Sequence, residues 1–144
     1  MNLSKNFTLD ELTISQEATR SGLQNKPTSA HTANLMGLCE NILQPLRDKA
    51  MRPVVVSSGF RSPTVNRRIG GSKSSQHTKG EAADFTVPGM SVAEVVALMR
   101  KMRLPYDQLI DEFGAWIHVS YSPLHRRQVL TARRVGGETV YKPL

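Results

Sequence analysis

The sequence is poor in cysteine and contains no long apolar run. Cys39 is the only cysteine among 144 residues, which excludes an internal disulfide and any metal site built from a cysteine cluster. A transition metal would therefore have to use histidine and carboxylate ligands. No apolar segment approaches the ~20 residues of a membrane-spanning helix, so we expect no stable membrane insertion. Residues 1–12 also lack the apolar core of a signal peptide, which predicts synthesis in a cytoplasm.

Acidic residues are scarce relative to basic ones. Nineteen Lys and Arg against twelve Asp and Glu give a net charge of +7, which favours polyanionic partners such as nucleic acid or envelope polymers. The charge is spread along the chain in arginine pairs, and no common nucleic-acid-binding motif is present. We therefore expect no nucleic acid partner. The alternative, a basic nucleic-acid-binding protein, predicts an affinity that falls steeply with salt.

Helical patterns dominate the first part of the chain. Thr8 and Ser91 each begin a capping box, and Ser62-Pro63 has the form of a cap and a first helical residue. Apolar residues from Leu35 to Leu46 recur at helical spacing, so we expect an amphipathic helix there, with Cys39 buried on its apolar side.

Strand patterns dominate the second part. The predicted strands cover residues 54–56, 82–87, 108–113 and 116–121, with an edge strand at 137–141. Gly114-Ala115 separates two of these runs and predicts an antiparallel hairpin. Helices that lead and strands that follow indicate an α+β fold with a small antiparallel sheet packed with helices. We expect residues 1–144 to form one monomeric domain on which a helical extension, residues 1–30, is packed.

Three polar residues stand out by their surroundings. Asp84 lies inside an apolar strand, where an ionised carboxylate must be paired or bound to a metal. His118 also lies on an apolar strand, and His77 lies in a Gly/Ser loop before the Asp84 strand. Two histidines and one aspartate suit zinc and leave a fourth position for water. Histidines that are merely buried and hydrogen-bonded are an alternative of similar weight.

A longer pattern surrounds these residues. Ser75-x-His77-x-x-Gly80-x-Ala82-x-Asp84, followed by Trp116-Ile117-His118, resembles the metal-binding pattern of the peptidase M15 family. Ser57 to Ser62 resembles the Ser-Gly-Tyr-Arg-Ser segment of that family, and the resemblance extends over about residues 38–121. It implies a fold like that of Hedgehog and the DD-peptidases, and it is strongest to the compact, phage-associated branch.

The resemblance also implies residue roles. His77, Asp84 and His118 would bind Zn²⁺, and Arg61 would bind the substrate and stabilise the oxyanion, because its guanidinium is always charged. A structural ion pair is the alternative for Arg61. Further substrate contacts are expected from Ser75, Gln108 and Trp116, although Gln108 as an exposed strand residue and Trp116 as a packing residue are open alternatives.

The proton-carrying residue is harder to assign. Many family members place an acid three residues before the last histidine, where this chain has Ala115. We expect Glu112, at the end of the neighbouring strand, to act as general base and then acid. Asp111 is the alternative, because a strict two-residue turn would place it opposite His118.

These expectations combine into a functional hypothesis. The resemblance implies a zinc peptidase that cleaves the peptide stems of bacterial peptidoglycan, with the L-Ala–D-Glu bond as first choice. A D-Ala-D-Ala carboxypeptidase or cross-link endopeptidase is the alternative, and a non-catalytic zinc-binding structural or adhesion module is a further one. A phage or prophage endolysin fits the missing signal peptide, since a separate holin-type partner would release it from the cytoplasm to the cell wall.

Overall fold

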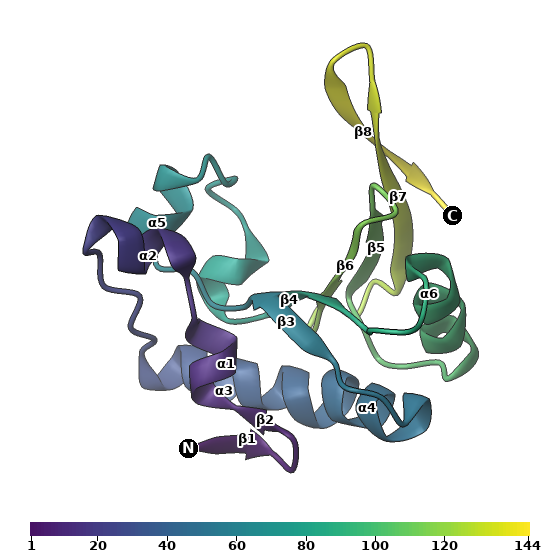
Figure 1. Cartoon of the computed structure of the whole chain (residues 1–144), viewed down its shortest axis with the longest axis horizontal. Helices are drawn as coiled ribbons and strands as arrows, with labels where there is room; N and C mark the ends of the chain where they lie inside the picture. Colours follow the sequence, from purple (N-terminus) through teal and green to yellow (C-terminus); the bar gives the residue numbers. More distant parts are fainter.

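The computed structural model describes residues 1–144 and contains helices packed around a twisted sheet (Figure 1). The α-helices are α1 (Leu9–Thr13), α2 (Gln16–Ser21), α3 (Ser29–Leu38), α4 (Gln44–Ala50), α5 (Pro63–Arg68) and α6 (Val92–Lys101). A π-helical segment, η1 (Cys39–Leu43), joins α3 to α4, and a 3₁₀ segment, η2 (Gln76–Lys79), precedes strand β4. The strands are β1 (Asn2–Ser4), β2 (Phe7–Thr8), β3 (Val55–Ser58), β4 (Ala82–Thr86), β5 (Gln108–Glu112), β6 (Trp116–Ser120), β7 (Gln128–Val135) and β8 (Glu138–Pro143).

The helices begin where the capping patterns predict. The side chains of Thr8 and Ser91 accept hydrogen bonds from the amides of Glu11 and Glu94, respectively. The side chains of these glutamates accept in return from the amides of the two cap residues, which completes a capping box at each helix. Ser62 accepts a hydrogen bond from the Val65 amide, and proline follows it at the first position of α5. Local sequence therefore determines these three helix starts.

The long central helix differs from the regular helix that the apolar spacing predicts. It runs from Ser29 to Ala50 without a break, and its middle, η1, is π-helical. Pro45 has no N–H and cannot close the ordinary bond to the carbonyl four residues back. Immediately before it, the Gln44 amide donates to the Cys39 carbonyl, five residues back, so the wider turn carries the helix past the proline. Cys39 itself is fully buried, as predicted.

The α+β prediction is confirmed. β1 and β2 form a small antiparallel sheet, and the other strands form a six-stranded sheet in the order β3-β4-β6-β5-β7-β8. The larger sheet is mixed, because β7 runs parallel to β5 while every other pair is antiparallel. The predicted edge strand is β8, but its partner β7 was not expected.

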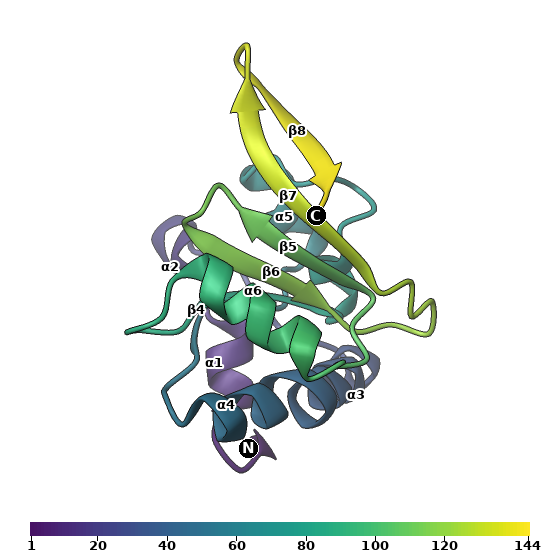
Figure 2. The same cartoon turned by 90° about the vertical axis from the view of Figure 1, so that its right-hand side faces the viewer.

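The two faces of the larger sheet have opposite character. One face carries fully buried apolar residues such as Phe85, Leu109 and Ile117, which join the main core together with residues of α3, η1, α4 and α6. Figure 2 shows α6 lying across β5 and β6 on this side. Side chains alternate along a strand, so Asp84, Glu112 and His118 project from the other face.

Residues before the sheet also belong to the main core. Leu3, Phe7 and Leu12, from β1, β2 and α1, are almost completely buried in the same cluster as the helix and sheet residues. The predicted extension therefore includes a strand pair as well as helices. None of the helices combines the length and the apolar character required to cross a membrane.

Candidate active site

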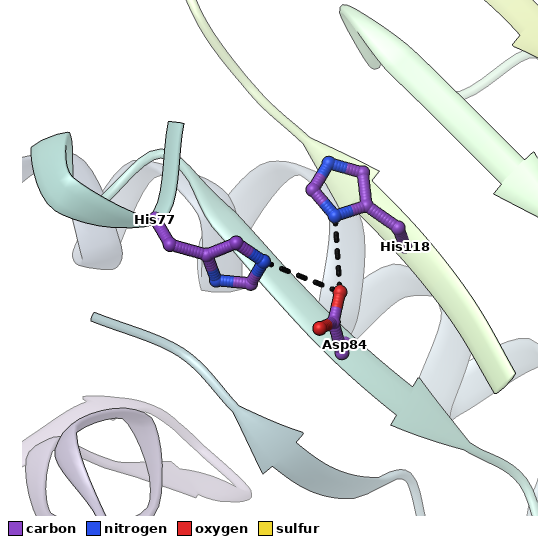
Figure 3. Close-up of side chains that lie close together, drawn as sticks. All are labelled: His77, Asp84 and His118. Atoms are coloured by element: carbon purple, nitrogen blue, oxygen red, sulfur yellow. Dashed lines mark hydrogen bonds and ion pairs between the residues drawn. The ribbon is translucent and has the colours of Figure 1, made fainter. Parts of the chain in front are cut away.

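Three side chains converge on the sheet face that is turned away from the main core (Figure 3). His77 comes from η2, Asp84 from β4 and His118 from β6, and Asp84 and His118 are direct neighbours across the antiparallel pair. The Asp84 Oδ1 atom lies 3.3 Å from His77 Nε2 and 3.0 Å from His118 Nδ1. The structure therefore brings the three predicted ligands together.

The hydrogen bonds of His77 indicate that a cation belongs between these groups. Its Nδ1 lies 2.8 Å from the Gly59 carbonyl oxygen, which can only accept, so Nδ1 carries the ring proton. In the neutral ring, Nε2 then directs a lone pair at the Asp84 carboxylate. Burial lowers the pKa of His77 and disfavours a second ring proton. Two electron-pair donors that face each other in this way form a ligand set for a metal ion.

The donor set and its dimensions suit zinc. Burial alone would raise the pKa of Asp84, but the hydrogen bond to His118 outweighs it and holds the pKa below its ordinary value, so the carboxylate is ionised. One atom from each of the three residues lies within 4.8 Å of the others. Two zinc bonds of ~2.1 Å at a tetrahedral angle separate their ligand atoms by about 3.4 Å, close to the two distances to Asp84 Oδ1. The residues present therefore fit zinc.

A tight turn positions His77. Ser75 caps η2 by accepting a hydrogen bond from the His77 amide, and Gly80 ends it in the left-handed conformation, with φ of 75°. A Cβ atom at Gly80 would also lie 2.6 Å from the His31 carbonyl oxygen. Only glycine meets both requirements, which explains its fixed spacing from His77 in the motif.

Arg61 is tied to the same ligand. Its amide donates to the His77 carbonyl oxygen at 3.1 Å, and the Phe60 amide donates to the Leu12 carbonyl oxygen at 2.7 Å. A Cβ atom at Gly59 would lie 2.2 Å from that Leu12 oxygen, so α1 and this segment meet in a contact that only glycine permits. The Arg61 Nε atom is buried and has no hydrogen-bond partner within the chain. A buried charged donor without a partner is costly, and a substrate oxygen would satisfy it.

The three predicted ligands line a cavity of about 710 Å³. Its lining includes all eight residues predicted for the site: Arg61, Ser75, His77, Asp84, Gln108, Glu112, Trp116 and His118. Gln108 donates a hydrogen bond to Gln128 at 2.7 Å, and the Trp116 ring packs at 5.6 Å from the ring of Phe113. The lining position of these residues is what a substrate contact requires, and the contact itself stays a prediction.

The structure separates the two candidate bases. A three-residue turn, Phe113 to Ala115, connects β5 to β6, so Ile110 and not Asp111 lies opposite His118. Glu112 then shares the cavity face with His118, whereas Asp111 points to the α6 side and forms an ion pair with Arg133. Burial raises the pKa of Glu112. A carboxylate with a raised pKa that lines the same cavity as the predicted ligands is suited to proton transfer.

Several lining residues were not predicted from the sequence. Ile110 and Leu130 form an apolar floor, and Arg134, Thr139 and Tyr141 line the cavity from the β7–β8 hairpin. Alternation of side chains along β7 and β8 would have identified the hairpin residues if the parallel pairing of β7 with β5 had been known. Tyr121, directly after β6, lines a smaller pocket beside α3.

The two other histidines lie away from the cavity. His31 accepts a hydrogen bond from the Thr28 amide at the start of α3 and packs on Phe60. His125 lies in an exposed loop against Tyr121. Neither lines the cavity.

An ion pair to a buried aspartate lies at the start of β5. Asp107 is completely buried and accepts hydrogen bonds from the Arg126 guanidinium at 2.9 and 2.8 Å, and from Gln76 at 2.8 Å. The hydrogen bonds from Arg126 hold the pKa of Asp107 well below its usual range. Gln76 precedes His77, so this carboxylate connects the start of β5 to the loop that carries a ligand.

Comparison with known proteins agrees with the geometry. A family model described as Peptidase M15 matches residues 5–120, which include all three ligands, Arg61 and Glu112. A search of curated proteins gives no match. The match covers most of the chain, and the chain therefore belongs to the peptidase M15 family.

Proposed function

We propose that this chain is a zinc-dependent peptidase that cleaves the peptide stems of bacterial peptidoglycan, with the L-Ala–D-Glu bond as its first-choice target. Family membership supports the coarser statement, a peptidase for peptidoglycan-type substrates. The observation that carries the zinc requirement is the arrangement of His77, Asp84 and His118, in which a neutral imidazole faces an ionised carboxylate inside an open cavity.

The chain's own groups supply the remaining chemistry. A zinc ion held here supplies a Lewis acid that polarises a carbonyl and lowers the pKa of water. Glu112 accepts a proton from the attacking water and returns it to the leaving amine, because its raised pKa suits both directions of transfer. The unpartnered Arg61 Nε donates to the developing oxyanion. Ile110 and Leu130 exclude water beneath the peptide.

The biological setting is part of the proposal. An enzyme for cell-wall peptides must reach the wall, and a phage or prophage endolysin released by a holin-type partner fits a chain with a net charge of +7 that approaches an anionic envelope. We propose that it acts there as a monomer in one peptidase domain.

The test compares two histidines. His118→Ala is expected to abolish clearing of a peptidoglycan zymogram and to reduce zinc content measured by atomic absorption. His125→Ala, in an exposed loop away from the cavity, is expected to leave both unchanged. Chelation should abolish clearing and added zinc should restore it, and mass spectrometry of the digest identifies the cleaved bond. A fully zinc-loaded wild-type protein that cleaves no peptidoglycan would contradict the proposal and favour a non-catalytic zinc-binding module.

A further inference from the structure

The β7–β8 hairpin adds a wall to the cavity beyond the part of the chain that the family model matches. The match ends at residue 120, and β7 begins at Gln128. In Figure 1 the hairpin rises on one side of the site while α5 and the loop after it stand on the other. Lining residues come from both sides, so the hairpin and the Arg61–His77 segment enclose one cavity.

Strand register determines which hairpin residues face the substrate. Trp116, Glu112, Ala132 and Tyr141 are paired in a row across β6, β5, β7 and β8. Paired residues project from the same face, so Tyr141 stands on the cavity side, separated from Glu112 only by the small Ala132. Arg134 follows two residues later on the same face of β7, opposite Thr139.

Arg134 has no acidic partner, in contrast to its neighbour. Arg133 faces the other side of the sheet and holds both carboxylate oxygens of Asp111, at 3.0 and 3.2 Å. The guanidinium of Arg134 makes a single hydrogen bond within the chain, to the Gly137 carbonyl oxygen at 3.1 Å. Its remaining N–H groups are free to bind an anion at the cavity wall.

The tyrosine beside it supplies a neutral donor. Tyr141 is about half exposed. Its partial burial, with the nearby charges of Glu112 and Asp84, raises its pKa, so its hydroxyl keeps its proton. A guanidinium and a phenol that line one cavity from the same face of one hairpin suit a carboxylate, which accepts from both.

We propose that Arg134 and Tyr141 bind the C-terminal carboxylate of the peptide stem. This inference rests on the proposed peptidase function and adds a selectivity for acidic, uncapped peptides. Tyr141 lies two strand spacings from Glu112, or roughly 10 Å, and an extended peptide covers that distance in about three residues. In the stem L-Ala-γ-D-Glu-L-Lys-D-Ala, the terminal D-Ala is the third residue after the L-Ala–D-Glu bond.

The experiment measures binding without turnover. The product tripeptide γ-D-Glu-L-Lys-D-Ala is titrated by calorimetry into zinc-loaded wild type, Arg134→Ala, Arg134→Lys and Lys142→Ala. Because a charge-assisted hydrogen bond is lost, Arg134→Ala should weaken binding about 10-fold or more, and Arg134→Lys should restore part of it. Lys142 lies on the same hairpin but on the other face, paired with Thr131, so Lys142→Ala should bind as wild type does.

Two modified peptides identify the carboxylate. The tripeptide with a C-terminal amide should bind wild type with the same reduced affinity that the acid shows for Arg134→Ala. The Arg134→Ala substitution should not lower the affinity for the amide any further. A peptide with D-isoglutamine, which lacks the carboxylate next to the cleaved bond, should still respond to Arg134→Ala. The inference would be overturned if Arg134→Ala lowered the affinity for the acid and the amide equally. It would also be overturned if Arg134→Ala had the Tm of wild type and lost no affinity for the acid. Acid-selective binding by a chain that hydrolyses no peptidoglycan would preserve the anion site and refute only the proposed activity.

Discussion

Adjacent carboxylates on β5 differ because they project from opposite faces of the sheet. On the α6 side, burial would raise the pKa of Asp111, but hydrogen bonds from Arg133 and the Gly114 amide outweigh it and hold the pKa below its ordinary value. On the cavity side, Glu112 is about as deeply buried and has no cationic hydrogen-bond partner, so its pKa is raised. The face with a compensating cation uses its carboxylate for structure, and the other face leaves one available for proton transfer.

The sharpest way to test this contrast is to neutralise each carboxylate. Glu112→Gln should lower kcat by ~10²–10⁴-fold with zinc retained, because it removes the proposed proton carrier. Asp111→Asn should keep kcat within a few-fold of wild type and should lower stability, since it removes the ion pair with Arg133. Kinetics on a purified stem peptide, with zinc content measured in parallel, decides between them. Full activity in Glu112→Gln would assign the base elsewhere.

The next largest expected effect is a difference in stability between substitutions of two neighbouring residues. Leu109 is fully buried in the main core, whereas Gln108 lines the cavity. Leu109→Ala should lower the free energy of unfolding by about 2–5 kcal/mol, because a core cavity is left behind. Gln108→Ala should change it by less than about 1 kcal/mol. Urea denaturation measures both, and equal losses would show that the cavity face is packed as tightly as the core.

A pH effect is expected at the other end of β5. The pKa of Asp107 is depressed in the folded state, so its contribution to stability is present above its unfolded pKa of about 3.9 and is lost as pH falls through the lower folded value. Arg126→Gln removes the main cause of that depression. We expect the variant to be less stable than wild type at pH 6 and the difference to shrink toward pH 2, measured by thermal unfolding. A pH-independent difference would show that Arg126 acts through packing alone.

The last prediction is that the Cys39 thiol does not react in the native protein. Burial raises the pKa of the Cys39 thiol to about 12, and its side chain is fully buried in η1. Ellman's reagent should therefore leave the native thiol unmodified at pH 8 and should react fully in 6 M guanidinium. Rapid labelling of the native protein would indicate that η1 opens locally.

Local patterns predicted much of the fold. Capping residues identified the starts of α1, α5 and α6, because each satisfies its own helix within three residues. The apolar strands around Asp84 and His118 made those polar residues conspicuous, and the structure brings both to one point.

Long-range pairing and unusual backbone could not be predicted in the same way. The parallel register of β5 and β7 depends on a return loop whose path no local pattern specifies, so the hairpin wall was missed. Phe113 adopts a positive φ of 59°, which few non-glycine residues do. The Ala115 amide donates to the Glu112 carbonyl oxygen, and Trp116 is the residue paired with Glu112, so the turn contains one residue more than the predicted two. That extra residue determines which acid faces the cavity.

Three hydrogen bonds connect α1 to the segment that carries Arg61, and that segment to His77. The Phe60 amide donates to the Leu12 carbonyl oxygen, and the Arg61 amide donates to the His77 carbonyl oxygen. Between them, the Gly59 carbonyl oxygen accepts from His77 Nδ1 and leaves Nε2 unprotonated. The proposed metal ligand His77 and the proposed oxyanion-binding residue Arg61 are therefore positioned by one short stretch of backbone that is hydrogen-bonded to the first helix. Misalignment of α1 would displace both together, so the precision of the catalytic centre depends on how firmly the amino-terminal residues are seated.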